Sequence, residues 1–139
     1  MARTFKDLVA FKRALEVVVA VYDATTTFPR TETYGLVAQL RRASISVISH
    51  IGEGQGRLTH GEWRQFLSQA RGSLFEVEAQ LIAAHRLAFL GEAELQHMTQ
   101  LIRGAGRALS GLIEWVRKEE KRAKQPRNSA TQQPVQRTS

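Results

Sequence analysis

Apolar residues recur every three or four positions along most of this chain, which is the spacing of helices that bury one face. The most regular stripe has alternating spacings of four and three, and it consists of Trp63, Leu67, Ala70, Leu74, Val77, Leu81, Ala84 and Ala88. Thr59 and Glu62 precede it at the spacing of a capping box, in which the two side chains satisfy free backbone N–H groups. The pattern predicts a helix that begins near Thr59 and that Gly91 ends.

Two further stripes predict the first and last helices. The first stripe follows the capping-box pair Thr4 and Asp7 and stops at Pro29. It consists of Leu8, Phe11, Leu15, Val18, Tyr22 and Thr25. The last stripe begins soon after Gly91 and consists of Leu95, Met98, Ile102, Ala105, Leu109, Leu112 and Val116.

The second helix is unusually apolar, because residues 43–52 carry no charged side chain. It is predicted to begin near Thr31 or Glu32 and to end between Gly52 and Gly56. Two stripes run along it, one made of Leu40, Ala43, Val47 and His50 and the other of Val37, Ser44, Ile48 and Ile51. An apolar face this broad is wider than a surface helix requires.

Four long helices joined by short connections predict an all-α fold, an antiparallel up-and-down four-helix bundle. A chain of 139 residues suits one domain of this kind. We expect the bundle to occupy residues 1–122. Residues 123–139 are polar, contain proline and offer little apolar surface, so a disordered basic tail is expected there.

Some apolar residues fall outside the single core stripe of each helix, and they favour self-association. On the third helix, Phe75, Ile82 and Phe89 lie seven apart on the side predicted to face away from the core. Ile45 and Ile48 belong to the broad apolar face of the second helix. Because large exposed apolar patches usually mark a partner, these five residues predict an interface between copies of the chain. The alternative is that long basic side chains or the tail cover them.

The sequence offers little for catalysis or for a metal ion. It contains no cysteine, which excludes thiolate zinc sites and cysteine nucleophiles. A di-metal bundle needs two Glu-x-x-His motifs, whereas this chain has one, from Glu94 to His97. We interpret His50 as a hydrogen-bonded structural residue, and the glycines of residues 52–57 as a helix stop that lacks the lysine of a phosphate loop. We therefore predict no enzyme activity, no cofactor and no bound metal.

We expect a cytoplasmic protein without a membrane segment, since no uncharged run approaches roughly 18 residues. The formal net charge is +7, which favours nucleic acid or another polyanion as a partner. The candidate nucleic-acid contacts are Arg41, Arg42, Arg57, Arg64, Arg71, Arg103, Arg107, Arg117, Lys118, Lys121 and Arg122. Ordinary salt bridges on a solvated face are the competing interpretation of these residues.

Several short motifs occur along nearly the whole predicted bundle. They are F-x-D-L at residues 5–8, F-P at 28–29, Y-G-L at 34–36, Q-L-R-R-A at 39–43, E-G-x-G-R at 53–57 and A-R-G-S at 70–73, followed by Glu76. In these motifs the chain resembles the four-helix bundle family encoded within intervening sequences of bacterial 23S ribosomal RNA genes. His50 and Gly52 depart from the asparagine and alanine that are usual in that family.

The resemblance implies a homopentamer of four-helix subunits with no established biochemical activity. It also implies distant kinship with the accessory variability protein of diversity-generating retroelements, a basic pentamer that binds nucleic acid and a reverse transcriptase. Two functions remain open, since fold does not fix function. One is a non-catalytic oligomer that binds RNA, DNA or a nucleic-acid enzyme through basic surfaces, and the other is a purely structural or protein-interaction assembly.

Overall fold

The computed structural model describes residues 4–5 and 8–125 of the chain. Within these residues lie four α-helices and no strand, which confirms the predicted all-α fold. The helices are α1 (Val9–Thr25), α2 (Leu36–Gln55), α3 (His60–Arg86) and α4 (Glu92–Lys124), and a short 3₁₀ turn, η2 (Arg30–Glu32), lies between α1 and α2.

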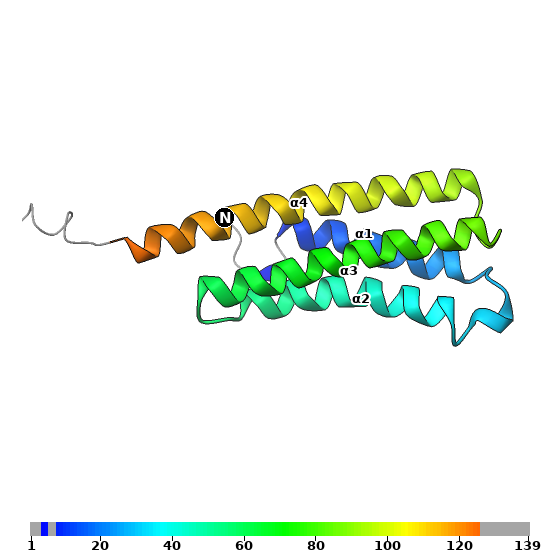
Figure 1. Cartoon of the computed structure of the whole chain (residues 1–139), viewed down its shortest axis with the longest axis horizontal. Coiled ribbons are helices and arrows are strands. Elements are labelled where there is room, and N and C mark those ends of the chain that lie inside the picture. Colours follow the sequence, from blue (N-terminus) through cyan, green and yellow to red (C-terminus); the bar gives the residue numbers. More distant parts are fainter. Residues whose placement is uncertain (1–3, 6–7, 126–139) are drawn as a thin grey trace, which may run out of the picture.

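The four helices pack side by side, and each runs opposite to the one before it (Figure 1). α1 and α3 both contact α2 and α4, whereas the diagonal pairs make no close backbone contact within the described ranges. This square arrangement is that of an up-and-down four-helix bundle. Because α1 and α3 occupy opposite corners of the square, their outer faces point away from each other.

The core forms largely where the sequence predicted it on three of the helices. The buried residues of α3 are Leu67, Ala70, Leu74, Val77, Leu81 and Ala84. Those of α2 are Val37, Leu40, Ala43, Ser44, Val47, Ile51 and Gly54, and those of α4 are Met98, Ile102, Gly104, Ala105, Leu109, Ile113 and Val116. Each fully buried leucine, isoleucine or valine contributes about 1.5–3 kcal/mol relative to an exposed one.

The predicted core stripe of α1 is wrong in part. Val18 and Thr25 of that stripe are buried, as expected. Leu15 and Tyr22 are 42% and 38% exposed, although the sequence pattern placed them in the core. The buried residues of α1 are small, and they are Ala10, Ala14, Val17, Val18, Val21, Ala24 and Thr25. Small side chains let α1 approach its two neighbours closely at native packing density, so the larger side chains lie at its flanks and outer face.

The start of α1 also differs from the prediction. The helix begins at Val9 and not near Thr4, and Asp7, the other half of the predicted capping box, lies outside the described residues. Ahead of the helix, the rings of Phe5 and Phe11 pack edge to face with centroids 5.1 Å apart. This aromatic contact brings the segment before α1 against the helix.

α2 begins at Leu36, later than the predicted start at Thr31 or Glu32. The residues between form η2, in which the backbone N–H of Glu32 donates to the carbonyl of Pro29 at 2.9 Å. Glu32 Oε1 then accepts a hydrogen bond from the backbone N–H of Leu36 at 3.1 Å. The carboxylate that was predicted to lie inside the helix therefore caps its free amino-terminal end.

α3 ends before Gly91, which the sequence had marked as its stop, and the chain reverses at Ala88. The backbone of Ala88 is left-handed, with φ of 67°. The N–H of Phe89 donates to the carbonyl of Ala84, and the N–H of Ala88 donates to that of His85, both at 2.9 Å. These two bonds form a Schellman motif, in which glycine usually takes the left-handed position. Gly91 instead precedes the first turn of α4 as its N-cap.

Replacing Ala88 with glycine is expected to stabilise the protein by about 1 kcal/mol, because a left-handed backbone strains alanine but not glycine. The matched control is Ala79→Gly, at an exposed position inside α3, which is expected to cost about 1 kcal/mol. Urea unfolding of the two variants measures both changes. Destabilisation by Ala88→Gly would contradict the described helix end.

α4 continues to Lys124, past the predicted boundary at residue 122. The last turns of α4, orange in Figure 1, extend beyond the ends of α2 and α3. The predicted tail after residue 125 lies outside the described residues. None of the helices in the described part of the chain is long and apolar enough to span a membrane.

Candidate nucleic-acid interface and apolar faces

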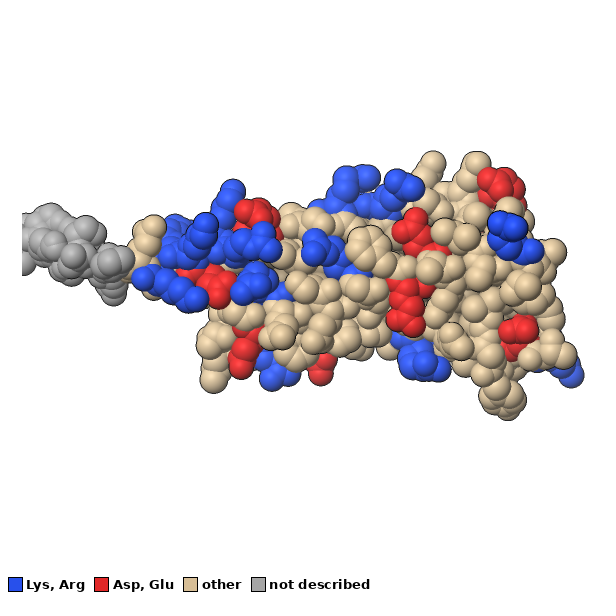
Figure 2. All heavy atoms as spheres, in the orientation of Figure 1, with Lys and Arg blue, Asp and Glu red and all other residues tan. Residues whose placement is uncertain are grey.

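Basic side chains gather on the last turns of α4. Figure 2 shows them as a cluster of blue spheres at the projecting end of the molecule. We call this cluster the basic end, and it consists of Arg117, Lys118, Lys121, Arg122 and Lys124, all of which are exposed. It presents positive charge to solvent on a helix end that reaches past the rest of the bundle.

Carboxylates of α4 neutralise part of the basic end. The ion pairs are Arg117 with Glu114 at 2.9 Å, Arg122 with Glu119, and Lys124 with Glu120 at 3.5 Å. Lys118 and Lys121 have no ion-pair partner among residues 4–5 and 8–125. These two lysines are therefore the cations of the basic end that are most available to an external anion.

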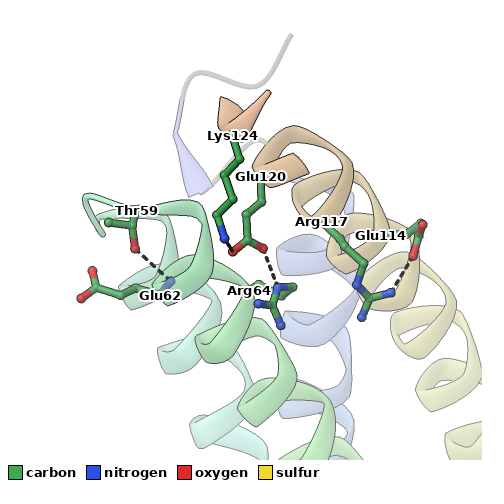
Figure 3. A network of polar contacts seen from close by, with 7 residues as sticks. All are labelled: Thr59, Glu62, Arg64, Glu114, Arg117, Glu120 and Lys124. Atoms are coloured by element: carbon green, nitrogen blue, oxygen red, sulfur yellow. Dashed lines mark hydrogen bonds and ion pairs between the residues drawn. The ribbon is translucent and has the colours of Figure 1, made fainter. Parts of the chain in front are cut away.

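Glu120 joins the basic end to the first turns of α3 (Figure 3). Its Oε1 accepts a hydrogen bond from Arg64 Nε at 3.0 Å, and only 17% of its side chain is exposed. The hydrogen bond from Arg64, with the positive charges of Arg64 and Lys124, holds the pKa of Glu120 below its ordinary value against the opposing effect of desolvation. Arg64, a predicted nucleic-acid contact, thus holds α3 and α4 together.

Replacing Glu120 with glutamine is expected to destabilise the protein at neutral pH. A carboxyl group whose pKa is lowered by folding adds stability above its unfolded pKa, and that stability is lost as the pH falls through the folded value. The difference in free energy of unfolding between wild type and Glu120→Gln should therefore shrink below about pH 4.3, the ordinary glutamate pKa. Denaturant unfolding at several pH values measures it.

The matched control for this experiment is Glu53→Gln. Glu53 is exposed and has no ion-pair partner in the described part of the chain. A difference for Glu120→Gln that does not change with pH would show that the Arg64 contact does not act through charge.

A second basic surface lies in a groove of about 500 Å³ between α3 and α4. We call it the arginine groove, because Arg71, Arg103 and Arg107 line it. Arg71 Nη1 donates to Ser110 Oγ at 3.3 Å, whereas Arg103 and Arg107 have no ion-pair partner within the described ranges. Glu78 is the one carboxylate of the lining. The groove therefore retains a positive balance.

The other predicted arginines are placed differently. Arg41 Nε donates to Thr25 Oγ1 at 2.9 Å, and its guanidinium carbon lies 4.4 Å from the centre of the Tyr22 ring. It thus holds α2 against the end of α1. Arg57 lies over an aromatic ring of α3 at 4.5 Å, and Arg42 is exposed on α2. Arg41 and Arg42 lie on α2, which makes no close backbone contact with α4 within the described ranges.

The five residues predicted as an interface fall into two groups. Ile48 and Phe89 are half-buried against the core of their own bundle, and Phe89 packs on an aromatic ring of the loop after α1. Ile45, Phe75 and Ile82 are 38%, 60% and 49% exposed. Phe75 lines the arginine groove, so its surroundings are cationic.

An apolar strip that the sequence analysis missed runs along the outer face of α1. It consists of Leu15, Val19 and Tyr22, and we call it the α1 strip. Val19 is 55% exposed, and the spacing of four and three places the three side chains on one side of the helix. The strip is exposed because alanines and valines occupy the core face of α1.

The sequence analysis considered His50 and His97 as possible metal ligands, and the structure shows the surroundings of both. His50 Nδ1 lies 3.1 Å from Ser46 Oγ, which lies 3.0 Å from Ser73 Oγ on α3, so the prediction of a hydrogen-bonded His50 is confirmed. His97 and Glu94 are exposed on α4. In the described part of the chain, no three histidine, aspartate or glutamate side chains lie together as metal ligands would.

Comparison with known proteins identifies the family of this chain. The family model of the 23S rRNA-intervening sequence protein matches residues 6–111. Since this match covers well over half of the 139 residues, the chain belongs to that family. No curated protein matches it. The matched span includes the arginine groove and ends before the basic end.

Proposed function

We propose that this member of the 23S rRNA-intervening sequence protein family is a non-catalytic, oligomeric bundle that binds nucleic acid through its basic surfaces. The observation that carries the proposal is that some cations of α4 have no carboxylate to pair with. Lys118, Lys121, Arg103 and Arg107 are exposed and have no ion-pair partner among the described residues. Phosphates neutralise such groups and release counterions, which favours binding at low salt.

The matched substitutions at the basic end test this proposal. Lys118→Gln/Lys121→Gln removes two unpaired cations, whereas Arg117→Gln/Arg122→Gln removes two that face carboxylates. Both pairs change the net charge equally. We expect the lysine variant to bind single-stranded RNA more weakly than the arginine variant does. Its salt slope should be smaller than that of wild type by about 1.4, or about 0.7 for each phosphate that the protein no longer neutralises.

Fluorescence anisotropy of a labelled oligonucleotide at several salt concentrations measures both quantities. Equally weakened binding in the two variants would mean that only net charge matters. Unchanged binding in both variants would remove the basic end from the proposal.

Self-association is the second part of the proposal, and the apolar faces support it. A closed ring of more than two copies needs two different patches on each subunit, one for each neighbour. The α1 strip and Ile82 are exposed and lie on diagonal helices of the bundle. We infer that the α1 strip of one copy packs against the Ile82 face of the next copy in a closed ring. Family resemblance implies that this ring has five subunits.

A structural or protein-interaction assembly is the alternative function, and the same apolar faces favour it. The two functions differ in one observable property. A nucleic-acid-binding oligomer retains RNA or DNA with an affinity that falls with salt, whereas a purely structural assembly retains none.

A further inference from the structure

We propose that the arginine groove binds one unstacked nucleotide of a single strand, with the base against the ring of Phe75 and the phosphate among the arginines. This inference rests on the proposed function and specifies the form of nucleic acid that the protein takes. Four lining residues carry it: Phe75, Arg71, Arg103 and Arg107.

The aromatic part of the site is Phe75. It is 60% exposed, which makes it the most exposed phenylalanine in the described part of the chain. Every base has a flat apolar face that stacks on an aromatic ring without regard to sequence. Leu74 and Ile102, both buried, form the apolar floor beside it. The groove thus offers a base an aromatic wall over an apolar floor.

The cationic part of the site surrounds that ring. Arg71 lies one helical turn before Phe75 on α3, and Arg103 and Arg107 lie one turn apart on the facing helix. Ser110 adds a hydroxyl group that already accepts from Arg71. Three guanidinium groups against one carboxylate, Glu78, leave a positive balance that complements a phosphate.

Charge decides between a nucleotide and another subunit as the occupant. An apolar subunit surface laid over Phe75 would desolvate three guanidinium groups, none of which has an ion-pair partner in the described residues. Burying unpaired charge is costly. A nucleotide supplies the missing anion next to the ring. Phe75, predicted as an interface residue, is therefore better placed as a nucleotide contact, while Ile82 stays with the subunit interface.

The test is Phe75→Leu, which keeps an apolar side chain and removes the ring. Anisotropy with a single-stranded oligonucleotide should show an affinity about tenfold weaker than that of wild type. Binding of the same sequence as a duplex should not change, because its bases are already stacked. Light scattering should show the same oligomer, because the proposal places Phe75 outside the subunit interface.

Two results for the Phe75→Leu variant would overturn the inference. Equal single-strand affinity for wild type and Phe75→Leu would exclude the ring while leaving nucleic-acid binding intact. Dissociation of the oligomer in Phe75→Leu would make Phe75 an interface residue. If wild type retains no oligonucleotide at low salt, the inference and the proposed function fail together.

Photochemical cross-linking and competition locate the nucleotide and its source. An oligonucleotide that carries 5-iodouracil should, on irradiation, modify the tryptic peptide of residues 72–86, which contains Phe75. If the cross-link falls instead on the tryptic peptide that contains Trp115, the assignment is overturned. Thymidine monophosphate should compete only at far higher concentration than the strand, and competition at equal concentration would identify a free-nucleotide site and overturn the proposed single strand.

Discussion

Replacing Val19 or Ile82 with glutamate is expected to convert the assembled protein into folded monomers. Both side chains are about half exposed, so a carboxylate at either position costs the isolated subunit little. In the assembly, the same carboxylate would be desolvated against apolar side chains without a partner, at a cost of several kcal/mol. Light scattering gives the mass, and circular dichroism shows whether the helices remain.

Mixing the two variants tests how the copies meet. In a head-to-tail ring, Val19→Glu keeps an intact Ile82 face and Ile82→Glu keeps an intact α1 strip. An equimolar mixture should therefore form a heterodimer that grows no further, since its two remaining faces both carry glutamate. Gln65→Glu, at an exposed polar position of α3, is the control that adds the same charge and should leave the ring unchanged.

The outcomes differ for other arrangements. If the mixture remains monomeric, the two faces do not meet, and an interface that pairs each patch with itself becomes the better account. If Val19→Glu alone stays fully assembled, the α1 strip is not part of the interface.

Replacing Gly54 with alanine is expected to destabilise the bundle, and replacing Gly72 with alanine to stabilise it. A Cβ atom at position 54 would lie 3.0 Å from both Phe66 Cβ and Trp63 Cδ1, so α2 and α3 would have to separate. Overpacking of this kind costs about 1–3 kcal/mol, and the better helix propensity of alanine returns about 1 kcal/mol of it. At position 72 a Cβ meets nothing within 4 Å, so only the propensity gain remains.

Thermal and urea unfolding of these two variants give the difference directly. Gly72→Ala is expected to be more stable than Gly54→Ala by about 1–3 kcal/mol. Two variants of equal stability would show that α2 and α3 are not held together as closely at this point as described.

The regular stripe of α3 made its buried face predictable, because the spacing of four and three over 27 residues keeps one side of a helix toward its neighbours. The capping pair Thr59 and Glu62 also placed its start correctly, since Thr59 Oγ1 accepts from the backbone N–H of Glu62 at 3.1 Å. Its end was not predictable in the same way. Ala88 adopts a backbone conformation that its own side chain disfavours, and tertiary contacts outweigh that local preference.

The core face of α1 was predicted only in part, because hydrophobicity was weighed more than size. The side chains of Leu15 and Tyr22 have more apolar surface than those of Ala10 and Ala14, and they also recur at a helical spacing. Which stripe faces inward depends on how closely the neighbouring helices approach, which a single sequence does not state.

The sequence likewise could not predict which charged side chains contact one another. The carboxylate that engages Arg64 is Glu120, 56 positions away, and the ring beneath Arg41 belongs to α1. Contacts between helices depend on the rotation of each helix within the bundle. Composition therefore predicted a basic protein, while only the packing separated the engaged arginines from those that remain available.

Binding of single-stranded RNA or DNA by the wild-type oligomer, measured between about 50 and 200 mM salt, tests the central claim most directly. Four cations of α4 have no ion-pair partner among the described residues, namely Arg103, Arg107, Lys118 and Lys121. Their repetition around the proposed assembly predicts retention at the lower salt concentration. The logarithm of the association constant should fall linearly with the logarithm of salt, by about 0.7 for each phosphate neutralised. If the oligomer retains no labelled strand at the lower salt concentration, nucleic-acid binding is contradicted and the structural assembly takes its place.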